Sequence, residues 1–182
     1  NYIDMQRDDI EITTDPLRIS ESNPIIVEDG WQGLFQNGTD SDNGNCDNFQ
    51  IRNIHIKCET ADGLIGSLAD YCGGICRPYF AKGTKSTANL IENCSFDGII
   101  KGGGICADYC AMNGRIIIEN CYSTGNIRGW FSGGICGSAC GGNLTPEYSG
   151  SEKSFVTIRN CYSNGDISTN GGGICGSSCG LS

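Results

Sequence analysis

The sequence is poor in the residues that mark several common classes of protein. Only 12 Lys and Arg stand against 21 Asp and Glu, which gives a formal net charge of -9. A nucleic-acid-binding surface needs clustered cations, and no run of basic residues occurs. A bilayer-spanning helix needs roughly 20 apolar residues, and no apolar run approaches that length. We therefore expect no nucleic acid partner and no membrane insertion.

Groups suited to catalysis are also scarce. The single histidine, His55, alternates with Ile54 and Ile56 and so is predicted to face away from both. Paired acids, Asp8–Asp9 and Asp40–Asp42, lie in polar segments that are typical of solvated surface. Because no Ser-His-Asp or Cys-His set can be nominated, we expect no catalytic site, no metal site and no cofactor, and hence no enzyme.

Glycine and cysteine, by contrast, are abundant, with 28 and 13 residues, and they recur in a repeat. Its pattern is Ile-x-Asn-Cys, then Gly and Ile, then Gly-Gly-Ile-Cys-x-x-x-Cys. Copies occupy 91–110, 118–140 and 158–179, and a degenerate copy lies near 51–76. In that earlier copy Ile54 replaces the cysteine after the asparagine, and Gly66 is interpreted as standing in for the first paired cysteine.

The repeat predicts stacked strands. Its apolar runs, such as RIII (115–118) and FVTI (155–158), are short, β-branched and bounded by Asn, Gly or Ser. Strand–turn units of about 25–30 residues favour an all-β, right-handed parallel β-helix; a sandwich of hairpins is the alternative. We divide the chain into an N-terminal extension, 1–24, and one β-helix domain, 25–182, with an inserted loop at 141–154. Trp31, Leu34 and Phe35 form a short N-terminal capping segment.

In such a stack, equivalent residues of successive repeats lie above one another. We expect Ile105, Ile135 and Ile174 to form one internal column, and Ile127 and Ile167 another. We expect the asparagines that precede the cysteines to stack at a turn, because asparagine tolerates positive φ and its amide can bond the next repeat. These asparagines are Asn93, Asn120 and Asn160.

The cysteines favour disulfides over a zinc site or a thioredoxin-like redox motif, since a repeated motif indicates a structural role. Bonds within a C-x-x-x-C pair and bonds between neighbouring repeats both remain open. The candidates in the paired motifs are Cys72, Cys76, Cys106, Cys110, Cys136, Cys140, Cys175 and Cys179, with Cys46 and Cys58 as an extra pair. The cysteines that follow the turn asparagines are predicted to be buried thiols: Cys94, Cys121 and Cys161.

Two further features concern the surface. Asn37 and Asn143 begin Asn-x-Thr triplets in predicted loops, so both are candidate N-glycosylation sites. The last repeat is followed only by Gly180-Leu181-Ser182. An uncapped repeat exposes strand edges and core, and we expect a partner, a further copy of the chain or a continuation of the chain at that end.

The segments GWQGLFQNG, NFQIRNIHI, GGICRPYFAKGTKSTANLIENC and NCYSTGNIRGWFSGGICGS carry a resemblance. Over most of 25–180 the chain resembles repeat proteins of mimivirus- and marseillevirus-like giant DNA viruses, and it is similar to the bacterial GLUG-type repeat of surface proteins. The resemblance implies a disulfide-stabilised structural protein on the virion exterior, or otherwise an extracellular one, with other virion or capsid proteins as partners. Alternatives are an adhesin that binds a host glycan and a β-helix carbohydrate-active enzyme.

Overall fold

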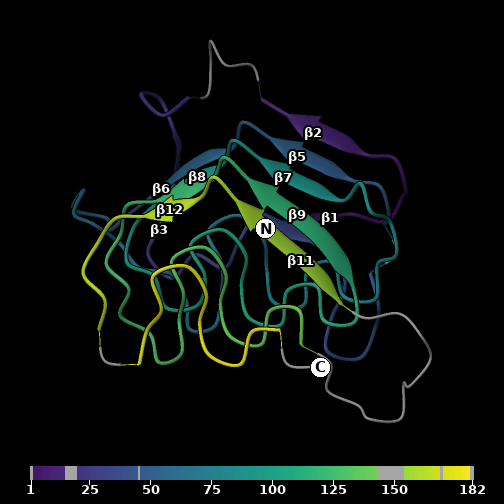
Figure 1. Cartoon of the computed structure of the whole chain (residues 1–182). Coiled ribbons are helices and arrows are strands. Elements are labelled where there is room, and N and C mark those ends of the chain that lie inside the picture. Colours follow the sequence, from purple (N-terminus) through teal and green to yellow (C-terminus); the bar gives the residue numbers. More distant parts are fainter. Residues whose placement is uncertain (1, 15–19, 45, 143–153, 169, 181–182) are drawn as a thin grey trace.

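The computed structural model of the chain describes every residue except 1, 15–19, 45, 143–153, 169 and 181–182. The described residues contain short strands and no helix, so the protein is all-β as predicted (Figure 1). The strands are β1 (Ile3–Asp4), β2 (Glu11–Thr13), β3 (Ile25–Glu28), β4 (Phe35–Gln36), β5 (Gln50–Arg52), β6 (His55–Glu59), β7 (Leu90–Glu92), β8 (Ser95–Asp97), β9 (Arg115–Glu119), β10 (Tyr122–Ser123), β11 (Phe155–Arg159) and β12 (Tyr162–Ser163).

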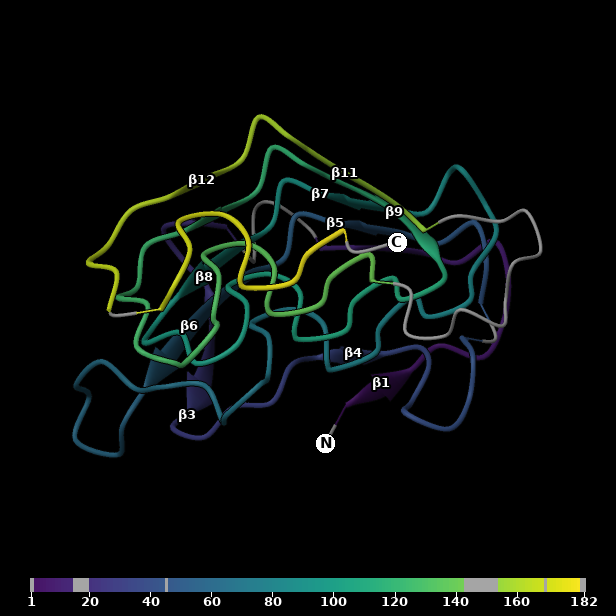
Figure 2. The same cartoon turned by 60° about the horizontal axis from the view of Figure 1, so that its bottom comes forward.

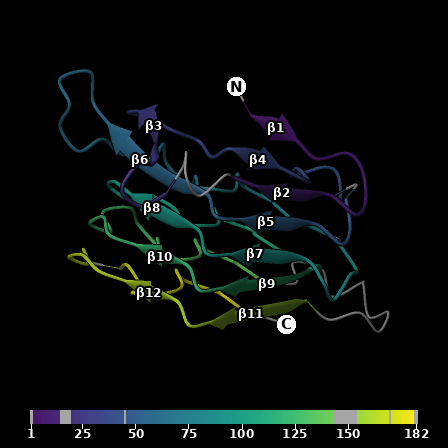
Figure 3. The ribbon, with the colours of Figure 1, turned by 90° about the horizontal axis from the view of Figure 1, so that it is seen from above.

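Ten of these strands form two five-stranded sheets in which every pairing is parallel. The first sheet has the order β2-β5-β7-β9-β11 and the second the order β3-β6-β8-β10-β12. Neighbours in each sheet therefore come from successive repeats, and we call the stretch that one repeat contributes a rung. Figure 3 shows the rungs following one another from the purple N-terminal strands to the yellow C-terminal strands.

The irregular connections of successive rungs also run side by side, as Figure 2 shows. Parallel bridges join Cys76 to Cys106, Cys106 to Cys136 and Cys136 to Cys175. The Ile105 N–H donates to the Ile135 carbonyl at 2.9 Å, and the Ile135 N–H donates to that of Ile174 at 2.8 Å. The isoleucine column predicted at these positions is confirmed. A second set of bridges, Ile100 to Ile127 and Ile127 to Ile167, confirms the other column.

An asparagine with positive φ lies between the two strands in each of the four rungs from β5–β6 to β11–β12. The φ angles of Asn53, Asn93, Asn120 and Asn160 are 57°, 52°, 54° and 52°. The Asn93 side-chain amide donates to Asn53 Oδ1 at 2.6 Å, and that of Asn160 donates to Asn120 Oδ1 at 3.3 Å. The predicted asparagine stack is confirmed, and Asn53 extends it by one rung.

The core follows from alternation along these strands. Ile51, Ile91 and Ile118 of the first sheet are fully buried and pair with one another in register. In the second sheet the Phe96 ring is fully buried, and a Cβ at Gly98 would lie 2.8 Å from its Cζ atom. Glycine at that position makes room for the ring.

The N-terminal residues are part of the stack. β1 pairs with β4 and β2 pairs with β5, so the predicted boundary at residue 24 does not coincide with a structural break. Phe35 of the expected capping segment is fully buried and bridges Cys76. The N-terminal residues join the stack because Ile12 pairs with Ile51 and continues the row of inward isoleucines.

The register corrects the alignment of the degenerate copy. Cys76, not Gly66, pairs with Cys106 and so holds the position of the first paired cysteine. The cause is a turn after β6, in which the Thr60 N–H donates to the Leu64 carbonyl at 2.9 Å. This turn lengthens the rung by residues that the other repeats lack. The predicted inserted loop, 141–154, lies mostly outside the described residues.

Candidate functional site: buried cysteine columns and an outer groove

Seven of the predicted disulfide cysteines lie together in two adjacent columns. The first column contains Cys76, Cys106, Cys136 and Cys175, which bridge one another in register. The second contains Cys110, Cys140 and Cys179, which occupy equivalent positions: the Gly141 N–H donates to the Cys110 carbonyl at 2.8 Å, and the Gly180 N–H donates to that of Cys140 at 2.9 Å. Turns that follow the first column bring the second column alongside it.

Thiols of the two columns lie near enough within each repeat to shift each other's pKa. The pairs are Cys106 with Cys110, Cys136 with Cys140 and Cys175 with Cys179. Neighbouring thiols within a column do the same, as Cys106 and Cys136 do. In the rung of Cys76, Phe80 holds the position of the second cysteine, because the Ala111 N–H donates to its carbonyl at 2.8 Å.

A third column contains the cysteines that follow the turn asparagines. Cys94 and Cys121 are fully buried, and Cys161 of the last described rung is half-buried. The Cys94 N–H donates to Cys121 Sγ at 3.4 Å, and Cys121 also contacts Cys161. Their thiols additionally donate to backbone carbonyls, such as that of Glu119 from Cys121 at 3.1 Å. The sequence predicted this arrangement, in which small apolar thiols fill a column.

The other disulfide candidates lie apart from these columns. Cys72 precedes the Gly-Gly-Ile step, and a Cβ at Gly102 would collide with its carbonyl, so Cys72 is equivalent to Gly102 and not to Cys106. The Cys58 thiol donates to the Glu28 carbonyl at 3.3 Å, whereas Cys46 lies among Asp8, Asp9 and Asp47. No contact within the described part of the chain joins Cys46 to Cys58.

The surroundings of these thiols set their reactivity. Burial raises the pKa of Cys46 and of Cys58 to about 11, and burial is also the main cause that raises the pKa of Cys76. At the more open end of the first column, hydrogen bonds from Cys136 and then Cys179 lower the pKa of Cys175. Hydrogen bonds from Cys110 and Cys136 likewise lower the pKa of Cys140, to about 6, so thiols with a lowered pKa occur in both columns.

Asp108 is a buried carboxyl beside the second column that the sequence did not single out. Its side chain is 4% exposed, and its Oδ1 accepts the Ser138 N–H at 2.9 Å. Burial raises its pKa to about 7. This carboxyl therefore changes charge near neutral pH inside the fold.

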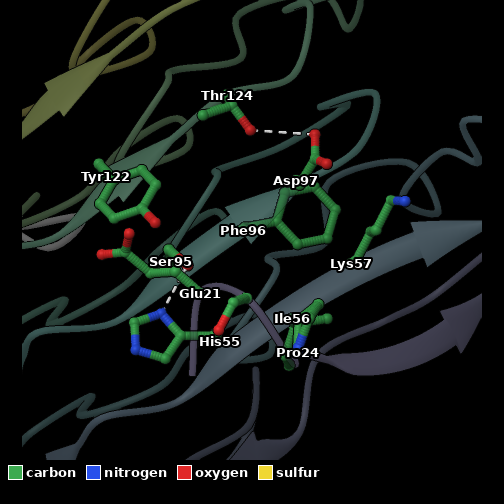
Figure 4. A pocket seen from close by; sticks show the side chains of 11 residues that line it. Glu21, Pro24, His55, Ile56, Lys57, Ser95, Phe96, Asp97, Tyr122 and Thr124 are labelled. Atoms are coloured by element: carbon green, nitrogen blue, oxygen red, sulfur yellow. Dashed lines mark hydrogen bonds between the residues drawn. The ribbon is translucent and has the colours of Figure 1, made fainter. Parts of the chain in front are cut away.

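An outer groove of about 330 Å³ lies between residues 21–24 and the second sheet (Figure 4). Two rows of outward side chains form its floor, one on each side of the buried Phe96 position. The first row contains His55, Ser95 and Tyr122, and the second contains Lys57, Asp97 and Thr124. Glu21 lies against the first row, and Pro24 adjoins His55 because Ile25 pairs with Ile56.

His55 is the most enclosed of the ionisable groups in this groove. It is 5% exposed, and its Nδ1 lies 2.8 Å from Ser95 Oγ. Burial lowers its pKa, although the nearby Glu21 carboxylate opposes this effect. The ring is therefore neutral at pH 7 and holds Ser95 in place. His55 faces away from Ile54 and Ile56 as predicted, but the segment at Glu21 covers it.

A smaller pocket of about 200 Å³ lies at an outer corner, against Trp130, Lys101 and Arg128. Trp130 is 72% exposed and meets the Phe131 ring edge-on, with 6.3 Å between centroids. Asp70 lies 3.9 Å from Lys101 in an ion pair at this corner.

Of the two candidate glycosylation sites, only Asn37 lies within the described residues. Asn37 is 1% exposed, and its amide nitrogen donates to the Cys46 carbonyl at 2.9 Å. The loop position expected from the sequence is thus an interior one, because the neighbouring Gly38 and Gly44 pack against the 79–82 segment. Asn143 lies outside the described residues.

Other classes of site find no support in the part of the chain that the structure describes. No group of three or more His, Cys, Asp or Glu side chains there could hold a metal ion. No described helix has the length and apolar character needed to cross a membrane. Comparisons with protein-family models, with curated proteins and with solved structures returned no match.

Proposed function

We propose that the chain is a right-handed parallel β-helix that serves as a non-enzymatic structural module on an exposed surface. The giant-virus resemblance suggests the virion exterior, and an extracellular surface is the alternative location. What supports the β-helix is the pairing of equivalent residues in three places: both sheets and the bridges along Cys76 and its successors. The net charge of -9 is consistent with a solvated outer surface, because molecules of like charge repel one another and stay in solution.

The observation that carries this proposal is the pair of cysteine columns. Within a column, equivalent Cβ atoms lie about one strand spacing apart, about 4.8 Å. A disulfide prefers about 3.5–4.5 Å between Cβ atoms. Across the turn, Cys136 and Cys140 are both buried and near enough to shift each other's pKa, and all 13 cysteines are free thiols in the structure. We therefore infer bridges within the repeats, each closing a short loop and contributing about 2 kcal/mol.

The inferred bridges are Cys106–Cys110, Cys136–Cys140 and Cys175–Cys179, with Cys76 left reduced opposite Phe80. Each forms by two-electron oxidation of two thiols, with loss of two protons to an oxidant such as molecular oxygen or a disulfide donor. Such bonds persist in oxidising compartments, which agrees with a virion or extracellular setting.

Peptide mapping of the unreduced protein by mass spectrometry tests the assignment. We expect three linked peptides that each span one C-x-x-x-C motif, and alkylation of Cys76 only after unfolding. A Cys76→Ala variant is the matched control, because it should keep all three bridges, whereas Cys106→Ala should leave Cys110 free. Fully reduced cysteines in protein secreted through an oxidising compartment would refute the cross-linked module, and a bound zinc ion would do the same.

A partner at the C-terminal end of the stack is the second part of this proposal. Ile127 and Ile135 are fully buried, whereas their equivalents in the last described rung, Ile167 and Ile174, are 51% and 36% exposed. Among the strands that the structure describes, β11 and β12 each pair with a neighbour on one side only. Another virion protein, a second copy of the chain or a continuation of the chain itself would cover this surface by adding a further rung.

Glycan binding is a second candidate function, and the outer groove is the observation that favours it. A carbohydrate-active enzyme has less support. The acid pairs Asp8–Asp9 and Asp40–Asp42 are exposed, and neither lines the groove. Glu21 and Asp97 do line it, but Asp97 accepts the Thr124 hydroxyl at 3.0 Å.

A further inference from the structure

We propose that the outer groove of the second sheet binds a neutral sugar. This inference goes beyond the structural role and does not depend on the cysteine bridges, because no cysteine lines the groove. Its volume, about 330 Å³, is at the lower end of the range typical of small-ligand sites, about 300–1,000 Å³.

The polar groups of the groove match the needs of a polyhydroxylated ligand. Carboxylates at Glu21 and Asp97 accept hydrogen bonds, the Lys57 ammonium donates them, and the hydroxyls of Tyr122 and Thr124 can do either. Sugar hydroxyls both donate and accept, so a mixed lining of this kind can satisfy them. In Figure 4 these side chains come from three neighbouring strands and from the segment at Glu21, and they surround one common space.

Aromatic rings supply the second element of sugar recognition. The rings of Tyr122 and Tyr162 are stacked, with 5.0 Å between centroids and an interplanar angle of 3°. Tyr162 is 54% exposed, so the pair extends the first row of the groove toward the last described rung. The face of an aromatic ring is electron-rich, and the C–H groups on one side of a pyranose ring can pack against it.

The charges of the groove select the class of sugar. Lys57 is already paired with Glu59, at 2.6 Å between Nζ and Oε1. The carboxylates of Glu21 and Asp97 leave the lining negative, and they would repel sialic acid, sulfated sugars and phosphates. The corner pocket has a net positive lining, since Lys101 and Arg128 outnumber Asp70 there. It therefore serves as a comparison site within the same protein.

The test is binding of the intact protein to an array of neutral oligosaccharides ending in glucose, galactose, mannose or N-acetylhexosamine, with sialylated and sulfated oligosaccharides alongside. We expect neutral sugars to bind. Asp97→Asn and Thr124→Val should each weaken binding of the best neutral sugar by about tenfold, the value of one lost hydrogen bond, and Tyr122→Ala should abolish it. Tyr71→Ala, which removes an exposed tyrosine at the corner pocket, should leave it unchanged.

Failure of all neutral sugars to bind would overturn the proposal, as would preference for anionic sugars. Binding that Tyr71→Ala removes and Asp97→Asn spares would also overturn it, because it would place the site at the corner. Asp97→Asn and Thr124→Val keep the size of the original side chains, so a loss seen with both and with an unchanged unfolding curve cannot come from misfolding. None of these outcomes affects the bridge assignment, which peptide mapping tests separately.

Discussion

Replacing the buried carboxyl of Asp108 by an amide should change how the stability of the protein depends on pH. The pKa of Asp108 is about 7 in the folded chain, against 3.8 for an ordinary Asp. The folded state thus holds the proton more tightly than the unfolded state does. Asp108 therefore lowers the free energy of unfolding as pH rises from about 4 to about 7, and its effect is constant above that.

The size of the effect follows from the same two pKa values. Between pH 5 and pH 8, ionisation of Asp108 should lower the free energy of unfolding by about 2.5 kcal/mol. Asp108→Asn keeps an oxygen to accept the Ser138 N–H but carries no charge. Urea unfolding at both pH values should thus show a fall that is about 2.5 kcal/mol smaller in the variant than in the parent chain.

Asp29→Asn is the matched control. The Asp29 carboxylate accepts the Ser67 N–H at 2.7 Å, and this bond, with that from the Ser67 hydroxyl, lowers the pKa of Asp29. Asp29 therefore stays ionised from pH 5 to pH 8, and its replacement should shift stability equally at both. If Asp108→Asn retained the full pH dependence of the parent chain, Asp108 would not be the buried titrating group and the reasoning would fail.

Two further predictions concern the stacking of rungs. Gly104→Ala should lower the free energy of unfolding in urea by about 3 kcal/mol, because the added Cβ would collide with the Gly134 carbonyl. Gly173→Ala is the control: its Cβ would meet only Ile167 Cδ1, at 3.6 Å, so it should change the free energy of unfolding by less than about 0.5 kcal/mol. Equal losses in the two variants would contradict the register. Asn120→Ala should lower the free energy of unfolding by about 1–2 kcal/mol, because positive φ is unfavourable for alanine. Asn120→Gly should lower it less. If Asn120→Ala left the free energy of unfolding unchanged, the turn would not require positive φ at this residue.

The repeat allowed much of this fold to be predicted from the sequence. Residues that stack on copies of themselves must repeat, so the spacing of Ile105, Ile135 and Asn120 revealed the columns. Structural positions that different residues occupy in successive repeats could not be recognised in this way. Gly66 was placed by its distance from Asn53, and the turn after β6 made that distance misleading. Asp108 has serine at the equivalent positions of later rungs, Ser138 and Ser177, so no pattern pointed to its burial.

The groove could not be predicted for a related reason, and this reason constrains its use. The isoleucines of the first sheet, the cysteines of the first column and the turn asparagines recur from rung to rung, whereas the second outer row changes from Lys57 to Asp97 to Thr124. The covering segment at Glu21 occurs in one rung only, and it lies beside His55 because β3 pairs with β6. A groove built from residues that do not repeat cannot recur along the stack. Sugar bound there should accordingly saturate at one per chain, whereas binding to the repeat itself would give several.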